Sequence, residues 1–267
     1  MLEYYRLALS RYARRKGRGR AVTLERDGDL ARVHDGTREI VIPHVSHAVD
    51  FGAGVNARLD AIADKYLGET GYAPREGDVV IDIGAGIGEF TLWCAERGAR
   101  VVAFEPDPLA YACLDRNTRM HGGISIYLYA LWKERIDLRL HGALDTRESS
   151  LIEDGRANAR SVDVEAWPLD QLAFMAQLPV IDLMKVDGEG VEPEILAGAA
   201  RTLRRTRVLA VDLSATARRP NLRSRVEAAL ETAAFAPVEN GREDTIMALN
   251  TAMVGPFNSR VPGELGV

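Results

Sequence analysis

The chain of 267 residues has only two cysteines and no long apolar run. Two cysteines cannot form a disulfide framework. Because Cys94 and Cys113 stand among core-type residues of predicted helices, we expect buried thiols in a reducing, cytoplasmic compartment. No window approaches the roughly 18 uninterrupted apolar residues that a membrane-spanning helix needs. Residues 1–20 also lack the apolar region and cleavage site of a secretory signal, so we expect an ordinary globular protein.

Acidic residues outnumber basic ones overall, but positive charge is concentrated at the N-terminus. The net charge of −5 argues against general nucleic-acid binding. Against the single acid Glu3, residues 1–20 carry Arg6, Arg11, Arg14, Arg15, Lys16, Arg18 and Arg20. The apolar residues beside them recur at helical spacing: Leu2, Tyr5, Leu9 and Tyr12. Such a segment is either a peripheral contact at the inner membrane surface, or a solvated arm or helix docked on its own domain.

From Asp78 onwards the chain alternates between predicted strands and predicted helices. This alternation predicts an α/β fold with a doubly wound, mostly parallel, Rossmann-like sheet. The predicted strands are 78–83, 99–106, 124–130, 180–187 and 208–214, and the predicted helices are 87–98, 107–122, 168–178, 193–205 and 221–234. We further expect a hairpin insertion over 135–166 and an antiparallel closing pair formed by FAPVEN and TIMALNTAMVG.

The segment before this region has a different pattern. Residues 21–43 contain short β-prone runs separated by Asp27-Gly28 and Asp35-Gly36, which predicts a small antiparallel meander. A helix is expected over 56–67. We therefore divide the chain into an N-terminal extension (1–75), a main domain (76–255) and a tail (256–267).

A glycine-rich loop with the sequence Asp82-Ile-Gly84-Ala-Gly86-Ile-Gly88 joins the first predicted strand of the main domain to a helix. Glycines let the backbone turn tightly and let a ligand approach the peptide groups. The third glycine comes one residue too early for the dinucleotide pattern G-x-G-x-x-G, which holds a pyrophosphate. S-adenosylmethionine has no phosphate, so the loop suits this cofactor. We expect Asp82 to face its positively charged amino acid portion through ordered water.

Glu105 stands at the end of the second predicted strand of the main domain. A carboxylate there can accept hydrogen bonds from both hydroxyls of a ribose. Methyltransferases and nicotinamide enzymes share this feature, so Glu105 indicates an adenosyl ligand without distinguishing the two. A nicotinamide oxidoreductase therefore stays an alternative.

Several motifs resemble those of FkbM-type methyltransferases, which use S-adenosylmethionine. They are EPDPLAYACLDRNTRMHG, Ala130-Leu131, Ser149-Ser150, Pro168-Leu169-Asp170-Gln171-Leu172 and, most specifically, Lys185-Val-Asp187-Gly-Glu189-Gly190-Val-Glu192. The resemblance runs from about Asp78 to Asp212, and the first 75 residues match nothing. It implies the doubly wound methyltransferase sheet. It also implies O-methylation, often of a sugar hydroxyl in a glycan or of a polyketide-like metabolite.

The resemblance also implies the residues that bind the cofactor. Gly84, Gly86 and Gly88 would line the methionine portion, Glu105 would hold the ribose with Pro106 beside it, and Ala130 and Leu131 would lie near the adenine. The chain departs from the family pattern at Gly86, where Asn is usual, and at His121, which replaces another common Asn. It departs again at Asp212-Leu213-Ser214, where a Glu followed by a His is more usual.

Asp187, Glu189 and Glu192 lie at and just beyond the carboxyl end of a predicted buried strand, where open α/β sheets bind ligands. An alcohol is a poor nucleophile, and a carboxylate acting as general base typically contributes about 10²–10⁴-fold in rate. We predict Asp187 as the base or acceptor-orienting group, with Glu189 second, whereas Glu192 is expected to cap the helix that follows. Lys185 is expected to be structural or paired with an acid.

A metal is the remaining question at this site. Acids this close raise one another's pKa unless a cation joins them, so a divalent metal is conceivable, although we assign no metal ligand. His44 and His47 lack a companion ligand at a suitable spacing, which favours loop histidines or residues of an acceptor pocket.

The leading hypothesis is an S-adenosylmethionine-dependent O-methyltransferase that acts on a sugar hydroxyl of a glycan or glycan precursor. One alternative keeps the cofactor and changes the acceptor to a polyketide, another small metabolite or a carboxylate. A more distant alternative is a non-catalytic scaffold that binds the cofactor. No nucleic-acid partner is expected, and the oligomeric state stays open.

Overall fold

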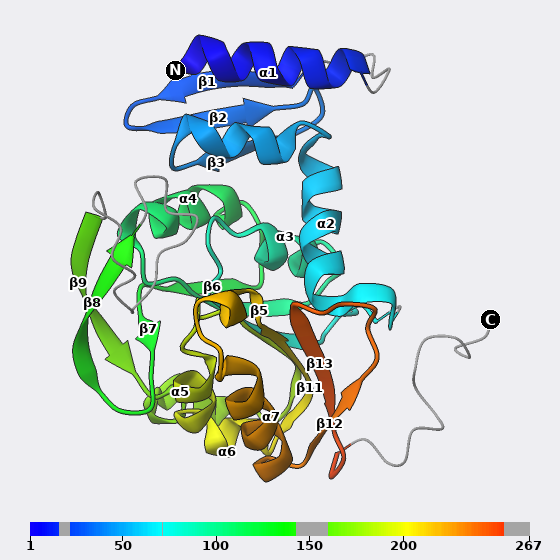
Figure 1. Cartoon of the computed structure of the whole chain (residues 1–267), viewed down its shortest axis with the longest axis vertical. Coiled ribbons are helices and arrows are strands. Elements are labelled where there is room, and N and C mark those ends of the chain that lie inside the picture. The colour runs from blue at the N-terminus through cyan, green and yellow to red at the C-terminus, as the bar shows by residue number, and fades with distance from the viewer. Residues whose placement is uncertain (16–21, 71, 143–159, 254–267) are drawn as a thin grey trace.

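The computed structural model describes residues 1–15, 22–70, 72–142 and 160–253. Its centre is a seven-stranded sheet with the order β12-β13-β11-β10-β4-β5-β6 (Figure 1). The strands are β4 (Val79–Ile83), β5 (Arg100–Phe104), β6 (Ile124–Tyr127), β10 (Ile181–Val186), β11 (Thr206–Asp212), β12 (Phe235–Val238) and β13 (Thr245–Asn250). Neighbours from β6 to β11 are parallel, and β13 runs antiparallel to β11 and β12. The predicted fold class is confirmed.

The central strands are apolar throughout because helices cover both faces of the sheet. Residues that alternate along the strands enter two separate cores, as Val80 and Ile81 of β4 do. One core is covered by α2 (Val55–Leu67), α3 (Glu89–Ala95) and α4 (Pro108–Thr118), and the other by α5 (Glu192–Ala197), α6 (Ala200–Leu203) and α7 (Leu222–Thr232). The predicted buried thiols, Cys94 and Cys113, both belong to the first core.

The N-terminal extension forms a helix on a small antiparallel sheet (Figure 1). Its elements are α1 (Leu2–Arg15), β1 (Thr23–Asp27), β2 (Leu30–His34), β3 (Glu39–Ile42) and the 3₁₀ helix η1 (Val45–Phe51), after which α2 leads to the main sheet. Leu9 of α1 is buried against this sheet. The helix is therefore docked on its own chain, and a single continuous core joins the extension to the main sheet.

A third sheet has the order β7-β9-β8 and covers one side of the site described below. It consists of β7 (Ala130–Leu131), β8 (Ile136–Gly142) and β9 (Arg160–Trp167). The antiparallel pairing of β8 with β9 confirms the predicted hairpin insertion. Its connection, 143–159, lies outside the described residues and so does the predicted tail. None of the described helices has the length and apolar character needed to span a membrane.

Three predicted elements were wrong in detail. The predicted strand over 124–130 is divided, because β6 stays in the main sheet while Ala130 pairs with Ala166 of the third sheet. The predicted helix over 168–178 is two 3₁₀ turns, η3 (Leu169–Gln171) and η4 (Ala173–Gln177), separated by an extended Leu172. The predicted helix over 193–205 is broken into α5 and α6 next to Gly198, where a Cβ would lie 2.1 Å from the Trp132 carbonyl oxygen.

Candidate active site

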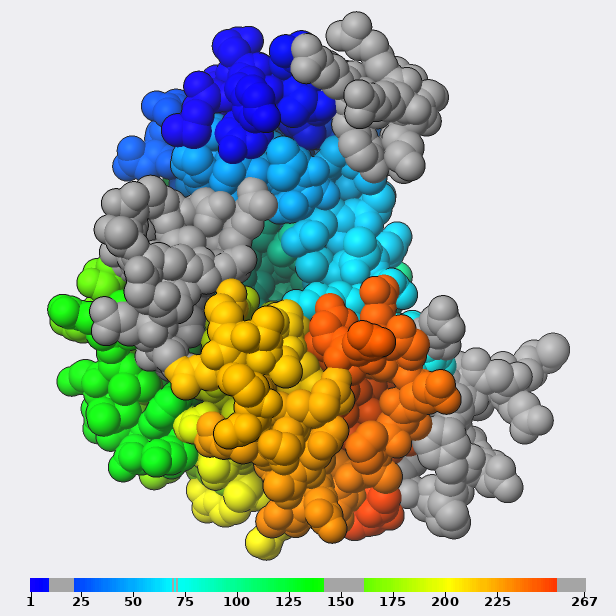
Figure 2. Space-filling model, in the orientation of Figure 1, coloured from blue at the N-terminus to red at the C-terminus, as the bar shows by residue number. Residues whose placement is uncertain are grey.

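A cavity of about 420 Å³ lies at the carboxyl ends of β4, β5 and β10. The strand order reverses between β4 and β10, and such switch points are where open α/β sheets bind ligands. The glycine loop, Glu105, the short strand β7, the loop after β10 and the helix α2 all contribute to its wall. On the face drawn in Figure 2, the surface is hollowed between the cyan α2 region and the gold segment that follows β11.

Two glycines shape the loop after β4. The amides of Gly84 and Ala85 donate hydrogen bonds of 2.9 and 3.0 Å to the carbonyl of Phe104. Gly84 has a φ of +72°, and a Cβ there would lie 2.0 Å from the carbonyl oxygen of Asp187. Gly86 has a φ of +58°, and a Cβ there would meet nothing within 4 Å. Gly84 thus allows close contact with the end of β10, whereas Gly86 leaves an open approach to the backbone.

Two residues predicted to bind the cofactor, Asp82 and Gly88, lie behind the cavity wall. Gly88 packs α3 against α4, because a Cβ there would lie 2.8 Å from Cδ1 of Leu114. Asp82 is fully buried and accepts a hydrogen bond of 2.6 Å from the Thr91 hydroxyl. Its other oxygen lies 2.9 Å from Nζ of Lys185. Both residues therefore support the loop from behind, and the described cavity wall includes neither.

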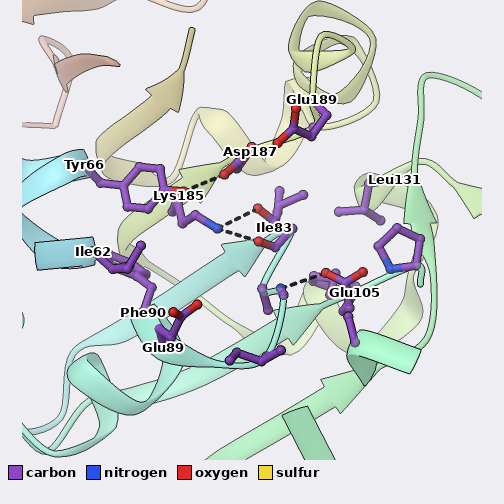
Figure 3. A pocket seen from close by; sticks show the side chains of 18 of the residues that line it. Ile62, Tyr66, Ile83, Glu89, Phe90, Glu105, Leu131, Lys185, Asp187 and Glu189 are labelled. Carbon is purple, nitrogen blue, oxygen red and sulfur yellow. Dashed lines mark hydrogen bonds between the residues drawn. The ribbon is translucent and has the colours of Figure 1, made fainter. Parts of the chain in front are cut away.

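Lys185 fastens the glycine loop to β10. Its buried ammonium donates hydrogen bonds of 2.6 Å to the carbonyl of Gly84 and 3.3 Å to that of Ile83, beside its ion pair with Asp82 (Figure 3). Burial alone would lower the pKa of Lys185, but the charges of Asp82 and Asp187 and the hydrogen bond to Asp82 together outweigh it, and the pKa is raised. The prediction that Lys185 pairs with an acid is confirmed.

Glu105 lies on the cavity wall at the end of the site away from Asp187 (Figure 3). Its two carboxylate oxygens accept hydrogen bonds from the amides of Gly86, at 2.7 Å, and Asp107, at 2.8 Å. Burial raises the pKa of Glu105 to about 8, even though these amides favour the anion. Each oxygen keeps a further lone pair that can accept a hydroxyl hydrogen. The other cofactor residues predicted on this wall line it too: Pro106, Ala130 and Leu131.

Asp187 lies half-buried on the opposite part of the cavity wall. Its Oδ2 accepts a hydrogen bond of 2.5 Å from the Tyr66 hydroxyl, and Nζ of Lys65 lies 3.7 Å from the same oxygen. Its Oδ1 is buried and has no hydrogen-bond partner among the described residues. Burial would raise the pKa of Asp187, but the charges of Lys65 and Lys185 together hold it below its usual range.

Two further acids surround Asp187. Glu189 lines the cavity with a φ of +54°, and Arg218 forms an ion pair with it at 2.8 Å. Burial and the neighbouring carboxylates of Asp187 and Asp212 raise the pKa of Glu189 to about 7. Asp212 is fully buried at the end of β11, with Oδ1 2.8 Å from Nζ of Lys65.

Glu192 has a structural position. One carboxylate oxygen accepts hydrogen bonds from the amides of Gly188, at 2.8 Å, and Gly190, at 3.1 Å, and the side chain is fully buried. Glu192 therefore has a structural role, as predicted. The amides that it binds belong to the loop before α5, however, and not to the first turn of that helix.

Carboxylate oxygens of Asp187, Glu192 and Asp212 lie within 4.8 Å of one another, a grouping that suits a divalent cation. The Lys65 ammonium already provides positive charge between Asp187 and Asp212. His47 is buried and lines the cavity, whereas His44 accepts a hydrogen bond of 3.2 Å from the Ser46 amide. Of these two histidines, His47 lies where a residue of an acceptor pocket would lie, and His44 does not.

The contribution of α2 to the cavity was not predicted from the sequence. Arg58, Ile62, Lys65 and Tyr66 all line the cavity, and Arg58 forms an ion pair of 2.6 Å with Glu89. Arg58, Ile62 and then Lys65 or Tyr66 follow one another at intervals of three or four, which places them on one side of the helix. A mixed polar and apolar face was thus visible in the sequence, but nothing there showed which part of the fold it would meet.

Solved methyltransferase structures resemble this chain at low sequence identity. Fibrillarin from Aeropyrum pernix, solved with natively bound S-adenosyl-L-methionine, is 13% identical, with a TM-score of 0.44; the alignment covers 85% of this chain and 99% of that one. Precorrin-6y C5,15-methyltransferase from Geobacter metallireducens is 16% identical, with a TM-score of 0.39; the alignment covers 66% of this chain and 81% of that one.

Sequence comparison gives a more specific result. The hexuronic acid methyltransferase AglP of Haloferax volcanii is 28% identical over 145 residues, which make up 53% of this chain and 58% of that relative. The methyltransferase FkbM domain matches residues 82–235, more than half of the chain. This range includes the glycine loop, Glu105 and the acids around Asp187. The chain therefore belongs to the FkbM family of S-adenosylmethionine-dependent methyltransferases.

Proposed function

We propose that this methyltransferase transfers the methyl group to oxygen, and that its acceptor is a sugar hydroxyl of a glycan or glycan precursor. The observation that carries the proposal is the carboxylate of Asp187. It lies on the cavity wall at the carboxyl end of β10, with one oxygen held and the other without a partner in the described structure. The similarity to a hexuronic acid methyltransferase supports a sugar as the acceptor.

The residues at the other end of the cavity fit S-adenosylmethionine. Glu105 offers lone pairs to ribose hydroxyls, Gly86 leaves the loop backbone open, and Ala130 and Leu131 form an apolar wall suited to an adenine. The cofactor supplies a methyl group that its sulfonium has already activated. Two tasks remain for the protein, namely alignment of the acceptor and removal of its proton. Alignment alone can contribute on the order of 7 kcal/mol or more.

Asp187 is the group proposed to receive the acceptor hydroxyl. Because its pKa is lowered, it is anionic throughout the neutral pH range and can accept the hydroxyl hydrogen. Glu189 is the second candidate, since a pKa of about 7 matches the pH at which a general base works best. In our proposal Asp187 orients the hydroxyl and takes its proton, and Glu189 contributes to the same acidic wall.

The test uses methyl-labelled S-adenosylmethionine with oligosaccharides that contain neutral or uronic sugars. We expect label in an alkali-stable methyl ether. Asp187→Asn should lower kcat by about 10²–10⁴-fold while the Kd for S-adenosylhomocysteine stays within about threefold. Asp182→Asn is the matched control, because Asp182 lies near the start of the same strand, is not among the residues that line the cavity and pairs with Arg207.

Two results would contradict this proposal. Alkali-labile label would identify a carboxylate as the acceptor, since methyl esters hydrolyse in base and methyl ethers do not. Undiminished transfer by Asp187→Asn, together with a loss in Glu189→Gln, would move the role of base to Glu189.

A contact between α1 and an anionic membrane is a separate proposal. The docked helix leaves Met1, Tyr4 and Leu7 exposed, and its sequence is rich in arginine. We expect the wild-type protein to sediment with vesicles that contain phosphatidylserine and not with neutral vesicles. Tyr4→Ser combined with Leu7→Ser should reduce that sedimentation severalfold. Equal recovery with both kinds of vesicle would contradict it.

A further inference from the structure

Part of the wall around Asp187 comes from outside the family domain. The FkbM match begins at residue 82, whereas α2 ends at Leu67. Lys65 and Tyr66, in the last turn of α2, nevertheless reach the cavity and contact Asp187 across 121 residues of sequence. The segment that precedes the family domain therefore takes part in the site.

Tyr66 and Lys65 engage the same oxygen of Asp187. The Tyr66 hydroxyl donates to Oδ2 at 2.5 Å, and Nζ of Lys65 lies 3.7 Å from this oxygen and 2.8 Å from Oδ1 of Asp212. Oδ1 of Asp187 is left without a described partner. The two side chains from α2 thus hold one oxygen of the Asp187 carboxylate and with it the position of the whole group.

The position of Tyr66 is fixed by packing. Its ring is buried and meets the ring of Phe90 edge-on, with centroids 5.4 Å apart. Nζ of Lys185 lies 4.8 Å from the centre of the Tyr66 ring, which is a favourable cation–π distance. A tyrosine held in this way fixes the direction of its hydroxyl and with it the orientation of the Asp187 carboxylate (Figure 3).

The charges around Asp187 assign a separate task to Lys65. The surrounding acids are Asp82, Glu189, Glu192 and Asp212, and the nearby cations are Lys65, Lys185 and Arg218. Lys185 contacts Asp82 and two loop carbonyls, and Arg218 pairs with Glu189. In the described structure, Lys65 is the cation that joins Asp187 to Asp212.

We infer that Lys65 and Tyr66 are positioning residues for methyl transfer. Together they bind one oxygen of Asp187, hold its carboxylate as the anion beside Asp212, and fix the orientation of that carboxylate on the cavity wall. The inference rests on the proposed function for the role of Asp187 in the reaction, but the contacts and the charge state can be tested without an acceptor.

The acceptor-free test is carbon-13 NMR of the aspartate carboxyl groups in the full chain, with Asp187 assigned by comparison with Asp187→Asn. In Lys65→Met the titration midpoint of Asp187 should rise by at least about one pH unit, because the positive charge of Lys65 is gone whereas the negative charge of Asp212 remains. Lys65→Arg should restore most of the shift. Lys133→Met is the control, because Lys133 is an exposed lysine next to Glu134.

The kinetic test separates positioning from folding. In the dependence of kcat on pH, Lys65→Met should shift the acidic limb to higher pH by a similar amount. The Kd for S-adenosylhomocysteine should change by less than about threefold. Tyr66→Phe keeps the buried ring and removes only the hydroxyl, so it serves even if Lys65→Met folds poorly. We expect it to lower kcat about tenfold, consistent with loss of one hydrogen bond to a charged group.

The outcomes distinguish the two proposals. An unmoved midpoint for Asp187 in a folded Lys65→Met variant, or full activity in Tyr66→Phe, would overturn the inference. A shifted midpoint without transfer to any sugar would support the inference and contradict the proposed acceptor.

Discussion

The amide of Gly86 donates a hydrogen bond of 2.7 Å to the carboxylate of Glu105, so the glycine loop and the acid after β5 form one unit. A ligand that approaches the loop at Gly86 therefore also meets this carboxylate. Burial raises the pKa of Glu105 to about 8, so cofactor binding at this residue, as we propose it, should depend on pH in the neutral range.

The first prediction concerns that sensitivity. Ribose hydroxyls that donate to Glu105 favour its anion, so binding must displace the proton when the pH is below about 8. The affinity for S-adenosylhomocysteine should thus rise by up to about tenfold per pH unit from pH 6 and level off near pH 8. Isothermal titration calorimetry checks this. Glu105→Gln should bind more weakly and with no such slope, and a flat profile for the wild type would contradict the prediction.

The second prediction compares substitutions at two loop glycines. Gly84→Ala should abolish cofactor binding and destabilise the fold, because its Cβ would lie 2.0 Å from the Asp187 carbonyl oxygen. Gly86→Ala has space, and only its positive φ is unfavourable, by roughly 1–2 kcal/mol. Gly86→Asn should be milder still, since Asn tolerates this conformation. Thermal unfolding and calorimetry should rank the stabilities as Asn above Ala at position 86, with Ala at position 84 the lowest.

The third prediction concerns the buried pair between Lys185 and Asp82. Lys185→Met leaves the Asp82 carboxylate buried without its cation, which should lower the free energy of unfolding by about 3–5 kcal/mol. Adding Asp82→Asn to this variant should recover part of the loss. Urea unfolding of both single variants and the double variant gives the coupling energy, and strictly additive losses would show that the pair is not energetically coupled.

The fourth prediction concerns stability as a function of pH. The pKa of Glu192 is raised to about 7 by burial, so the folded protein holds this proton more tightly than the unfolded chain does. The stability that this proton provides is complete below about pH 4.5 and is lost as the pH rises through about 7. Glu192→Gln keeps an acceptor for the Gly188 amide and cannot ionise. Between pH 5 and pH 8 the free energy of unfolding should fall less in this variant than in the wild type, and the difference should be on the order of 3 kcal/mol.

The sequence predicted that the glycine loop and Glu105 follow two buried strands because these signals are local. A buried parallel strand has a continuous apolar run, and Gly84 and Gly86 follow β4 directly. The segment 168–178 was harder to predict. Its buried residues Leu169, Leu172, Met175 and Leu178 repeat every three residues, and that period suits a 3₁₀ helix better than an α-helix.

The acidic half was only partly predictable. The cluster after β10 was visible as a motif, but the cation that joins it comes from α2, whose residue Tyr66 lies 121 positions before Asp187. Which helix face meets which strand end depends on how the extension packs on the sheet. A single sequence carries no local pattern for such a contact.

The pairing of β4 with β10 also bears on how the protein forms during synthesis. Lys185, whose ammonium binds the carbonyl of Gly84 in the glycine loop, follows Asp82 by 103 residues. A nascent chain that ends before β10 contains the whole glycine loop but neither Lys185 nor the backbone of Asp187 that packs against Gly84. Distant pairings of this kind form slowly, whereas the meander β1-β2-β3 joins neighbouring segments. We therefore expect the glycine loop to reach its final arrangement only after the residues up to Asp187 have left the ribosome.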